Sequence, residues 1–323
     1  MIKNGFILFI SCVALLAACI NTSRTSEKQE IAILKHITHP ALDELEKAYI
    51  EQIESLLSQN DSLKNKYYIK KYNANGSSTS ANTIAKSFEY KNVALILTIA
   101  TPPAIEVANI PSDIPHVYGA VADPEGAKII PSHRSTGIQN SGEAIIREAL
   151  TFIQSVWGEK VKIGTIYNPK EQNSVYVQNL MKNICRELGV ELKQAITETT
   201  SQLNGITNSL CKDVDIIYSA NDNNINSGVS TITAVTSKYN KPFVIGDLST
   251  LKDGALFAVG LKYSSMGIDL ANMSYGILLN KSIESYPPQA APKPEIWLNK
   301  KIAKELNFNL DENIMENFNI VTK

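Results

Sequence analysis

The sequence predicts an α/β fold of two doubly wound parallel-sheet lobes with a ligand cleft between them. Short β-rich runs alternate with amphipathic helical segments from Ile31 almost to the end of the chain, which is typical of parallel sheets covered by helices. Continuous apolar runs such as 93–97 indicate strands that are buried on both faces. About 290 residues remain after a leader and a polar tether, enough for two ordinary domains. A single larger sheet is the alternative.

In the first unit the pattern predicts strands at 31–34, 67–72, 93–99 and 116–120. Pro40 suits the first turn of a helix whose apolar residues recur at helical spacing from Leu42 to Leu56. Shorter helical segments are expected around 84–88 and 102–108. The stretch 73–82 is rich in Asn, Gly and Ser, which predicts a loop between a strand and a helix.

The alternation restarts after Thr136-Gly137. We expect helices at 143–157, 173–188, 203–212 and 227–239, with strands at 161–167, 190–193, 214–218 and 243–245. A strand at 257–261, a helix at 266–279 and the proline-rich stretch 287–294 predict that the chain crosses back between the lobes. A last strand at 294–298 and a helix at 299–306 would close the second lobe. The expected boundaries are 1–18 for a signal peptide, 19–29 for a tether, 30–137 plus 263–283 for the N-terminal lobe, and 138–262 plus 284–323 for the C-terminal lobe.

The N-terminus has the pattern of a lipoprotein signal peptide. Lys3 precedes an apolar run, small residues lead to Cys19, and a polar stretch follows at once. The apolar run 5–19 is shorter than the ~20 residues that a membrane-spanning helix needs, which counts against the alternative of an uncleaved anchor. We therefore expect cleavage before Cys19, acylation of its thiol, for example with palmitate, and a chain held on the cell membrane facing the periplasm or cell exterior.

Composition narrows the classes of function. The formal net charge is −1, from 31 Lys and Arg against 32 Asp and Glu, which gives no electrostatic footprint for nucleic acid. The histidines show no metal-ligand spacing, and GxSxG and Walker-type motifs are missing from the sequence, so we expect no enzyme activity, no metal and no cofactor. Beyond Cys19, the cysteines are Cys185 and Cys211. Each lies beside apolar residues, which favours two unpaired buried thiols, although an oxidising compartment would also allow a disulfide.

Candidate binding residues lie where strands lead into helices, because ligands of parallel α/β sheets bind beyond the carboxyl ends of the strands. Thr101 is expected at a helix N-cap, where its hydroxyl and free backbone N–H groups would attract an anion, and Ser174 could do the same from the other lobe. Simple capping is the alternative for both. Asp123 and Asp222 could hold an ammonium group, and Tyr263 could stack on an aromatic ligand or simply pack in the core.

The same loops carry a family resemblance. Its motifs are His39-Pro40-Ala41-Leu42-Asp43, Asn73-Ala74, Thr101-Pro102, Asp123-Pro124, Thr136-Gly137, Tyr167-Asn168-Pro169 with Asn173-Ser174, Asp222-Asn223, and Gly254-Ala255-Leu256 with Gly260 and Tyr263. With these motifs in this order, the chain resembles the substrate-binding lipoproteins of ABC importers related to the tryptophan and aromatic amino-acid binding proteins. That family has the type I periplasmic-binding fold, and the match spans 31–306.

The resemblance implies a monomeric receptor that closes on a small ligand, commonly an aromatic amino acid such as tryptophan, phenylalanine or tyrosine, and delivers it to the permease subunits of an ABC importer. On that analogy Thr101 and Ser174 would hold the carboxylate from opposite lobes, Asn173, Asp123 and Asp222 would lie near the polar end, and His39, Asn223 and Tyr263 would line the cleft. A sensor that presents the bound state to a signalling partner and an exported α/β hydrolase are the rival interpretations.

The sequence departs from its relatives at three places. Lys262 stands where relatives usually carry an acid before the late helix, Pro103 adds a second proline after Thr101, and Asn224 stands where threonine is common. If Lys262 faces the cleft, the ligand would carry an extra negative charge. If it faces solvent, the commoner place for lysine, aromatic amino acids remain the expected ligands.

Overall fold

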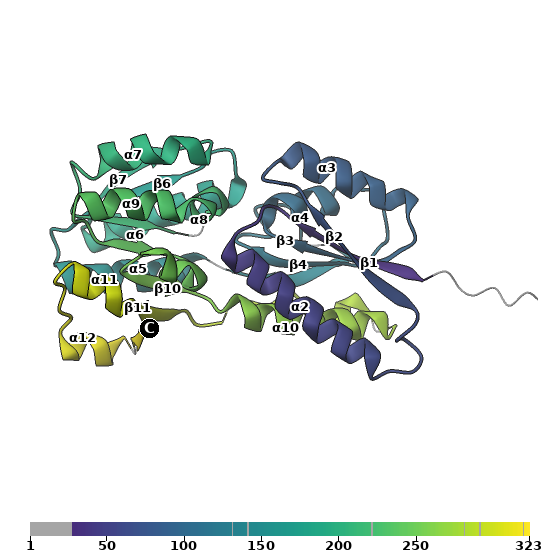
Figure 1. The fold of residues 1–323 in the computed structure, drawn as a ribbon. Helices are drawn as coiled ribbons and strands as arrows, with labels where there is room; N and C mark the ends of the chain where they lie inside the picture. The colour runs from purple at the N-terminus through teal and green to yellow at the C-terminus, as the bar shows by residue number, and fades with distance from the viewer. Residues whose placement is uncertain are drawn as a thin grey trace, which may run out of the picture.

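The structure, a computed structural model, describes residues 28–130, 132–140, 142–220, 222–280, 282–290, 292–318 and 320–323. Two α/β lobes lie side by side, each built on its own sheet (Figure 1). The alternative of a single larger sheet is therefore wrong. The expected signal peptide, Cys19 and the tether up to residue 27 lie outside the described residues, and the first strand already begins at Gln29.

The first lobe has, within the described residues, a five-stranded sheet in the order β2-β1-β3-β4-β5, and all neighbouring strands pair parallel. Its elements are β1 (Gln29–Lys35), α2 (Pro40–Ser58), β2 (Tyr67–Asn73), α3 (Ser78–Ser87), β3 (Val93–Ile99), α4 (Thr101–Ala108), β4 (His116–Val121), β5 (Ser135–Gln139) and α10 (Tyr263–Leu278). Ile31 and Ile33 of β1 pack in the core with α2 and α10, whereas Ala32 and Leu34 pack with α3 and α4. Helices thus cover both faces of the sheet, as predicted for a doubly wound fold.

The second lobe has, in the described part of the chain, a seven-stranded sheet in the order β12-β11-β10-β9-β8-β6-β7. β10 and β11 pair antiparallel, and the other neighbours pair parallel. Its elements are α5 (Gly142–Trp157), β6 (Lys162–Tyr167), α6 (Gln172–Leu188), β7 (Glu191–Ile196), α7 (Leu203–Leu210), β8 (Ile216–Ser219), α8 (Asn223–Ser227), α9 (Val229–Lys238), β9 (Phe243–Ile245), β10 (Phe257–Gly260), β11 (Glu295–Leu298), α11 (Lys300–Glu305), α12 (Glu312–Asn317) and β12 (Val321–Thr322). Short 3-10 helices lie at Phe88–Tyr90, Thr200–Gln202, Leu248–Asp253 and Ile283–Ser285.

The chain passes between the lobes after β5, after β10 and after α10 (Figure 1). Because α10 follows a strand of the second sheet but packs along α2 in the first lobe, it joins the two lobes covalently beside their junction. The exact lobe boundaries proposed from the sequence stay predictions.

A partly buried cluster of three charged side chains fixes the start of α2 against β1. The Lys35 ammonium lies 2.6 Å from both Asp43 Oδ1 and Glu46 Oε2. Burial would lower the pKa of Lys35, but the hydrogen bonds to Asp43 and Glu46 raise it above its ordinary value. The loop between β1 and α2, which carries His36 and His39, is thereby held at the junction of the lobes.

Most predicted elements are confirmed to within a few residues, but three expectations are wrong, and β5, α12 and β12 were not predicted. The stretch 73–82 is only partly a loop, because Ser77 accepts a hydrogen bond from Ser80 N–H at 3.2 Å and caps α3 from Ser78 onward. The expected helix 227–239 begins earlier and is divided into α8 and α9 at Gly228. Thr101 is the first residue of α4, and Ala100 is the N-cap, with a φ of 87°.

Cys185 and Cys211 are both free and buried, as the sequence predicts. Burial raises the pKa of the Cys185 thiol to about 12 and that of Cys211 in the same direction, so both are inert thiols at neutral pH.

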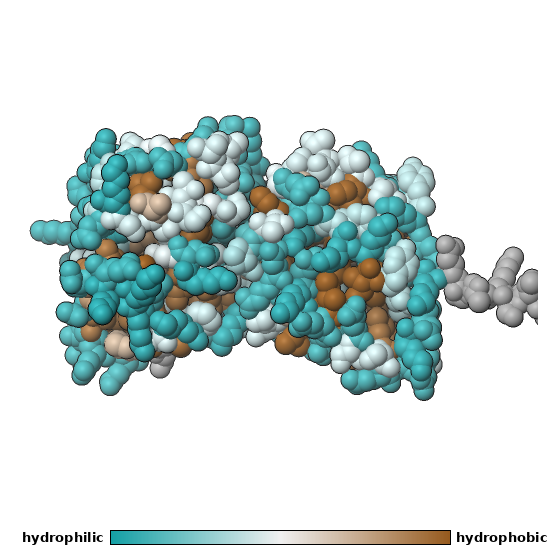
Figure 2. All heavy atoms as spheres, in the orientation of Figure 1, coloured by the Kyte–Doolittle hydropathy of each residue, from teal (hydrophilic) through white to brown (hydrophobic). Residues whose placement is uncertain are grey.

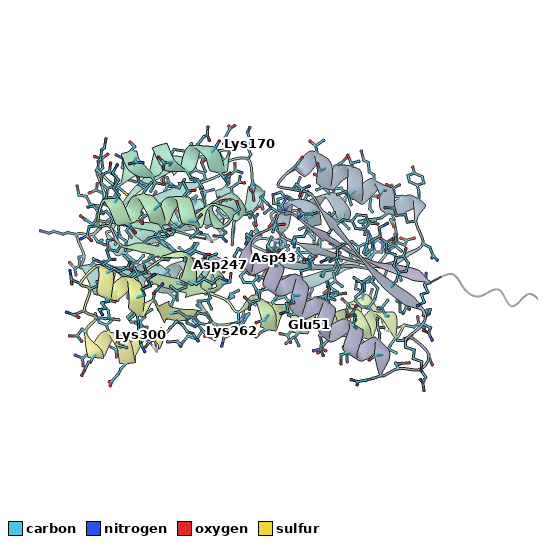
Figure 3. All side chains as sticks on the ribbon, in the orientation of Figure 1. Asp43, Glu51, Lys170, Asp247, Lys262 and Lys300 are labelled. Carbon is cyan, nitrogen blue, oxygen red and sulfur yellow. The ribbon has the colours of Figure 1, made fainter. Side chains whose placement is uncertain are left out.

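Polar residues cover most of the visible face of both lobes, which meet at a narrower waist (Figure 2). Of the labelled charged side chains, Asp43, Asp247 and Lys262 lie near this junction, whereas Lys300 lies on the far part of the second lobe (Figure 3). Among the residues that the structure describes, no helix combines the length and the apolar character required to cross a bilayer.

Candidate functional site

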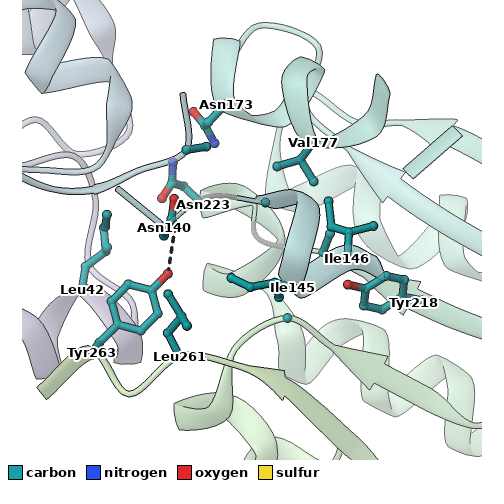
Figure 4. A pocket seen from close by; sticks show the side chains of 15 residues that line it. Leu42, Asn140, Ile145, Ile146, Asn173, Val177, Tyr218, Asn223, Leu261 and Tyr263 are labelled. Atoms are coloured by element: carbon teal, nitrogen blue, oxygen red, sulfur yellow. Dashed lines mark hydrogen bonds between the residues drawn. The ribbon is translucent and has the colours of Figure 1, made fainter. Parts of the chain in front are cut away.

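A cavity lies at the junction of the two lobes (Figure 4). About 600 Å³ lies between its lining atoms, counting the open mouth, and the centre of a water molecule can reach about 30 Å³ of it. The cavity is therefore narrow, and the free space inside it is smaller than is usual for small-molecule sites. It is lined by Leu42, Ala120, Ala122, Asn140, Gly142, Ile145, Ile146, Asn173, Val177, Tyr218, Ala220, Asn223, Gly246, Leu261 and Tyr263.

One side of the cavity is polar. Asn140 follows β5 and donates a hydrogen bond from Nδ2 to the Tyr263 hydroxyl at 3.3 Å (Figure 4). Its Oδ1 and the Oδ1 of Asn173, on the first turn of α6, are buried without a hydrogen-bond partner. A buried carbonyl oxygen without a partner costs about 1–3 kcal/mol. Both amide oxygens are therefore free to accept hydrogen bonds from a ligand.

The rest of the cavity is mostly apolar. Ile145 and Ile146 of α5 and Val177 of α6 form its wall in the second lobe, and Leu42 of α2 faces them from the first lobe (Figure 4). Leu261 lies on the crossing between β10 and α10. This side suits a hydrocarbon or aromatic group.

Asp222 lies behind the lining residues Asn173 and Asn223 and fixes the segments that carry them. Its Oδ2 accepts hydrogen bonds from Ser174 Oγ at 2.6 Å and Asn168 N–H at 2.9 Å, and its Oδ1 caps α8 by accepting from Ile225 N–H at 3.1 Å. Burial, and then the charge of Glu171, raise the pKa of Asp222 to about 6. Asp222 and Ser174 thus position α6 and α8, and neither lines the cavity.

Polar contacts join the lobes beside the cavity. His39 Nε2 of the first lobe lies 3.5 Å from Asn223 Oδ1 of the second, and His36 Nε2 lies 3.8 Å from Glu171 Oε1. Glu171 also accepts hydrogen bonds from Asn223 Nδ2 at 2.5 Å and Asn168 Nδ2 at 3.2 Å. Burial alone would raise the pKa of Glu171, but His36 and these amides keep it below its usual value. Burial lowers the pKa of His39 to about 4, so His39 is neutral at neutral pH.

The structure brings Asn173, Asn223 and Tyr263 to the cavity wall, and places His39 directly behind Asn223. Thr101 and Asp123 lie outside the lining. The Thr101 hydroxyl accepts a hydrogen bond from the N–H of the lining residue Ala122 at 3.4 Å, and Asp123 accepts one from Gly126 N–H at 2.9 Å in its own turn.

Lys262 turns away from the cavity. Its side chain is 48% exposed and its Nζ lies 2.7 Å from Glu295 Oε1, at the edge of the junction (Figure 3). Lys262 is outside the cavity lining, so the residue gives no reason to expect an extra negative charge on a ligand.

Sequence reasoning missed several lining residues, above all Asn140 and Tyr218. Asn140 follows β5, which the pattern of apolar residues did not reveal. Tyr218 lies within the buried run of β8 and has the sequence signature of a core residue. In the described part of the chain, no group of three or more His, Cys, Asp or Glu residues is placed to hold a metal ion.

Comparison with known families gives one match that covers nearly the whole chain. The model of the family described as "ABC transporter substrate binding protein" matches residues 30–321. Among curated proteins, the "Tyrosine-binding protein" of Clostridioides difficile (strain R20291) is 27% identical over 292 residues, which cover 89% of this chain and 84% of that protein.

Solved structures share the fold. A conserved domain protein from Vibrio cholerae is similar with a TM-score of 0.84 at 24% identity, covering 92% of this chain and 100% of that one. An ABC domain from Streptococcus pneumonia in complex with L-Trp has a TM-score of 0.82 at 23% identity, covering 91% of this chain and 100% of that one. A ligand-free, open substrate-binding protein with adhesive properties from Clostridium difficile has a TM-score of 0.66 at 23% identity, covering 91% and 99%.

Proposed function

The chain belongs to the family of ABC transporter substrate-binding proteins, and on this premise we propose that it binds an aromatic amino acid between its lobes and delivers it to a membrane permease. Binding uses lobe closure and no covalent chemistry. Closure excludes water from the cavity and so strengthens each polar contact with the ligand.

The buried amide oxygens of Asn140 and Asn173 carry the proposal. Both lack a hydrogen-bond partner in the structure and both belong to residues that line the cavity. An α-ammonium group supplies three N–H donors, which would satisfy both oxygens. Because the nearby lining is otherwise largely apolar, a ligand with one cationic donor group and a hydrocarbon body fits this lining best.

Two helix N-termini support a place for the carboxylate. Gly142 is the first residue of α5, which has 16 residues, and Asn173 is the second residue of α6, which has 17. Both residues line the cavity, and the N-terminus of a helix favours a carboxylate through its free N–H groups and its dipole. In this proposal Asn223 and Tyr263 also contact the ligand, while Ser174, Asp222 and His39 position the wall. Thr101 and Asp123 act only through the loop after β4.

The narrow apolar side supports an aromatic ring as the ligand's side chain, because a flat group fits a thin space between Ile145, Val177 and Leu42. The relative named for tyrosine and the similar structure with bound L-Trp agree with this choice.

Export and lipid attachment complete the proposal. We propose cleavage before Cys19 and acylation of its thiol, so that the segment between Cys19 and the start of β1 at Gln29 tethers the lobes to the membrane. The described chain enters β1 at the end of the first lobe away from the junction where the cavity lies (Figure 1). Metabolic labelling of the intact protein with a fatty acid tests this part, and absence of label on Cys19 would contradict it.

Isothermal titration calorimetry of the purified protein with tyrosine, tryptophan, phenylalanine, leucine, glucose and arabinose tests the ligand class. We expect binding of at least one aromatic amino acid, and an affinity loss of roughly tenfold or more in Asn173→Ala, which removes one acceptor for a charged donor. Asn183→Ala is the matched control, because Asn183 is exposed on the same helix. Binding of a sugar with no binding of aromatic amino acids would overturn the proposal.

A further inference from the structure

The hydroxyl of Tyr218 is a buried polar group that makes no hydrogen bond to the described part of the protein. The side chain is 0% exposed, and its oxygen lacks a hydrogen-bond partner. Leaving such a group unsatisfied costs about 1–3 kcal/mol. A phenylalanine would fill the same core position without that cost, so the oxygen is available to an external partner that can reach it.

The position of Tyr218 points to the ligand as that partner. Tyr218 lies on β8 between β9 and β6, packs in the core with α5 and α6, and lines the cavity. It lies across the cavity from Leu42 and Tyr263, and the isoleucines of α5 stand between it and the polar side (Figure 4). A ligand with its ammonium group at Asn140 would therefore extend its side chain past Ile145 toward the Tyr218 hydroxyl.

The chemistry of the hydroxyl limits what it can recognise. It is neutral, because burial raises the pKa of Tyr218 further above its ordinary value, and a neutral phenol both donates and accepts a hydrogen bond. The ring hydroxyl of tyrosine or the indole N–H of tryptophan can pair with it. The ring of phenylalanine cannot, and would leave the oxygen unsatisfied in the closed cavity.

We propose that Tyr218 determines specificity by hydrogen bonding to a polar atom on the distal part of the ligand's ring, so that tyrosine or tryptophan is preferred over phenylalanine. This inference rests on the proposed function, since it assumes an aromatic amino acid in the cavity. It adds the residue that distinguishes one aromatic side chain from another.

The test compares dissociation constants for tyrosine, tryptophan and phenylalanine in the unaltered protein and in Tyr218→Phe, measured by calorimetry. We expect the unaltered protein to bind tyrosine or tryptophan roughly tenfold more tightly than phenylalanine, as one buried hydrogen bond allows. Tyr218→Phe should lose this preference by weakening the tight ligand and leaving phenylalanine within about twofold, the change expected when a partnerless hydroxyl is removed.

Tyr118→Phe is the matched control. Tyr118 is also 0% exposed with a partnerless hydroxyl, but it packs in the first lobe with Ala104, Val121 and Ala127 and lies outside the cavity lining. Removal of the Tyr118 hydroxyl should leave the preference for tyrosine or tryptophan over phenylalanine unchanged.

Two failures are distinguishable. If the unaltered protein binds no aromatic amino acid, the proposed function fails and this inference fails with it. If it binds aromatic amino acids but shows no preference for tyrosine or tryptophan over phenylalanine, or if a folded Tyr218→Phe keeps the preference, only the role of Tyr218 is overturned. The comparison of ligands on the unaltered protein needs no variant, so a Tyr218→Phe that fails to fold does not prevent a decision.

Discussion

His116, at the start of β4, is a buried histidine whose two ring nitrogens are both bonded to hydroxyls. Nε2 lies 2.8 Å from Thr98 Oγ1, and Nδ1 lies 3.0 Å from Ser135 Oγ. Burial, with the nearby charge of Arg134, lowers the pKa of His116 to about 3. The native protein therefore requires the neutral ring, whereas the unfolded chain takes up a proton near pH 6.5.

This difference makes stability depend on pH. The folded pKa lies below the unfolded one, so the stability contributed by neutral His116 is fully present above about pH 6.5 and is lost as the pH falls toward 3. Between pH 7 and 5 the loss should be about 2 kcal/mol of unfolding free energy. Urea unfolding at both pH values should show a smaller loss for His116→Gln than for the unaltered protein. Equal losses in the two proteins would contradict the assignment.

Residue types, together with the family resemblance, predicted part of the cavity. The resemblance placed Asn173, Asn223 and Tyr263 at the cleft, and the structure brings all three to the lining of the cavity. Asn140 and Tyr218 could not be identified this way, since a buried polar atom without a partner becomes visible only when all its neighbours are placed. Thr101 and Asp123 have the expected residue types, but their side chains satisfy nearby backbone N–H groups instead of lining the cavity.

Among the elements, α10 and α2 pack closely because of Gly267. A Cβ at Gly267 would lie 2.5 Å from Leu45 O and 3.0 Å from both Ala48 Cβ and Tyr49 N. Backbone atoms of α2 cannot yield at so short a distance without moving the helix. Gly267→Ala should therefore separate α10 from α2 and destabilise the protein by about 1–3 kcal/mol, the usual cost of overpacking.

Gly205 in α7 provides the opposite case. Apart from its chain neighbours and the backbone of its own helix, no atom lies within 4 Å of its Cβ position, so Gly205→Ala should gain about 0.5–1 kcal/mol from helix propensity. Urea unfolding of both variants measures the contrast. Stabilisation by Gly267→Ala would mean that the two helices are not packed as described.

Elements with a strong apolar pattern could be predicted from the sequence. Elements that depend on a neighbouring strand or on a capping hydrogen bond could not. The buried runs of β3, β4, β6 and β9 were found because both faces of these strands are covered. β5 reads Ser-Thr-Gly-Ile-Gln, with too few apolar residues for a pattern, and it forms because β4 offers it a parallel edge. The start of α3 looked like a loop because its first turn is polar, while the capping bond from Ser80 N–H to Ser77 fixes it as a helix.

At the scale of the whole molecule, two lobes meet around a narrow cavity and are joined by contacts across their junction. His36 with Glu171 and His39 with Asn223 lie beside the cavity, so in the proposed mechanism these contacts part when the lobes open to admit a ligand. The alternation of strands and helices predicted two doubly wound sheets correctly. It could not predict these contacts, because they depend on how one lobe sits against the other.

A crystal structure of the protein with L-tyrosine or L-tryptophan would test the central claim most directly. We predict ligand density in the cavity between the lobes, with the ammonium group bonded to Asn140 Oδ1 and Asn173 Oδ1 and the ring between Ile145 and Leu42, directed at Tyr218. Density for the amino acid at another place on the protein, with this cavity empty at saturating ligand, would contradict the account.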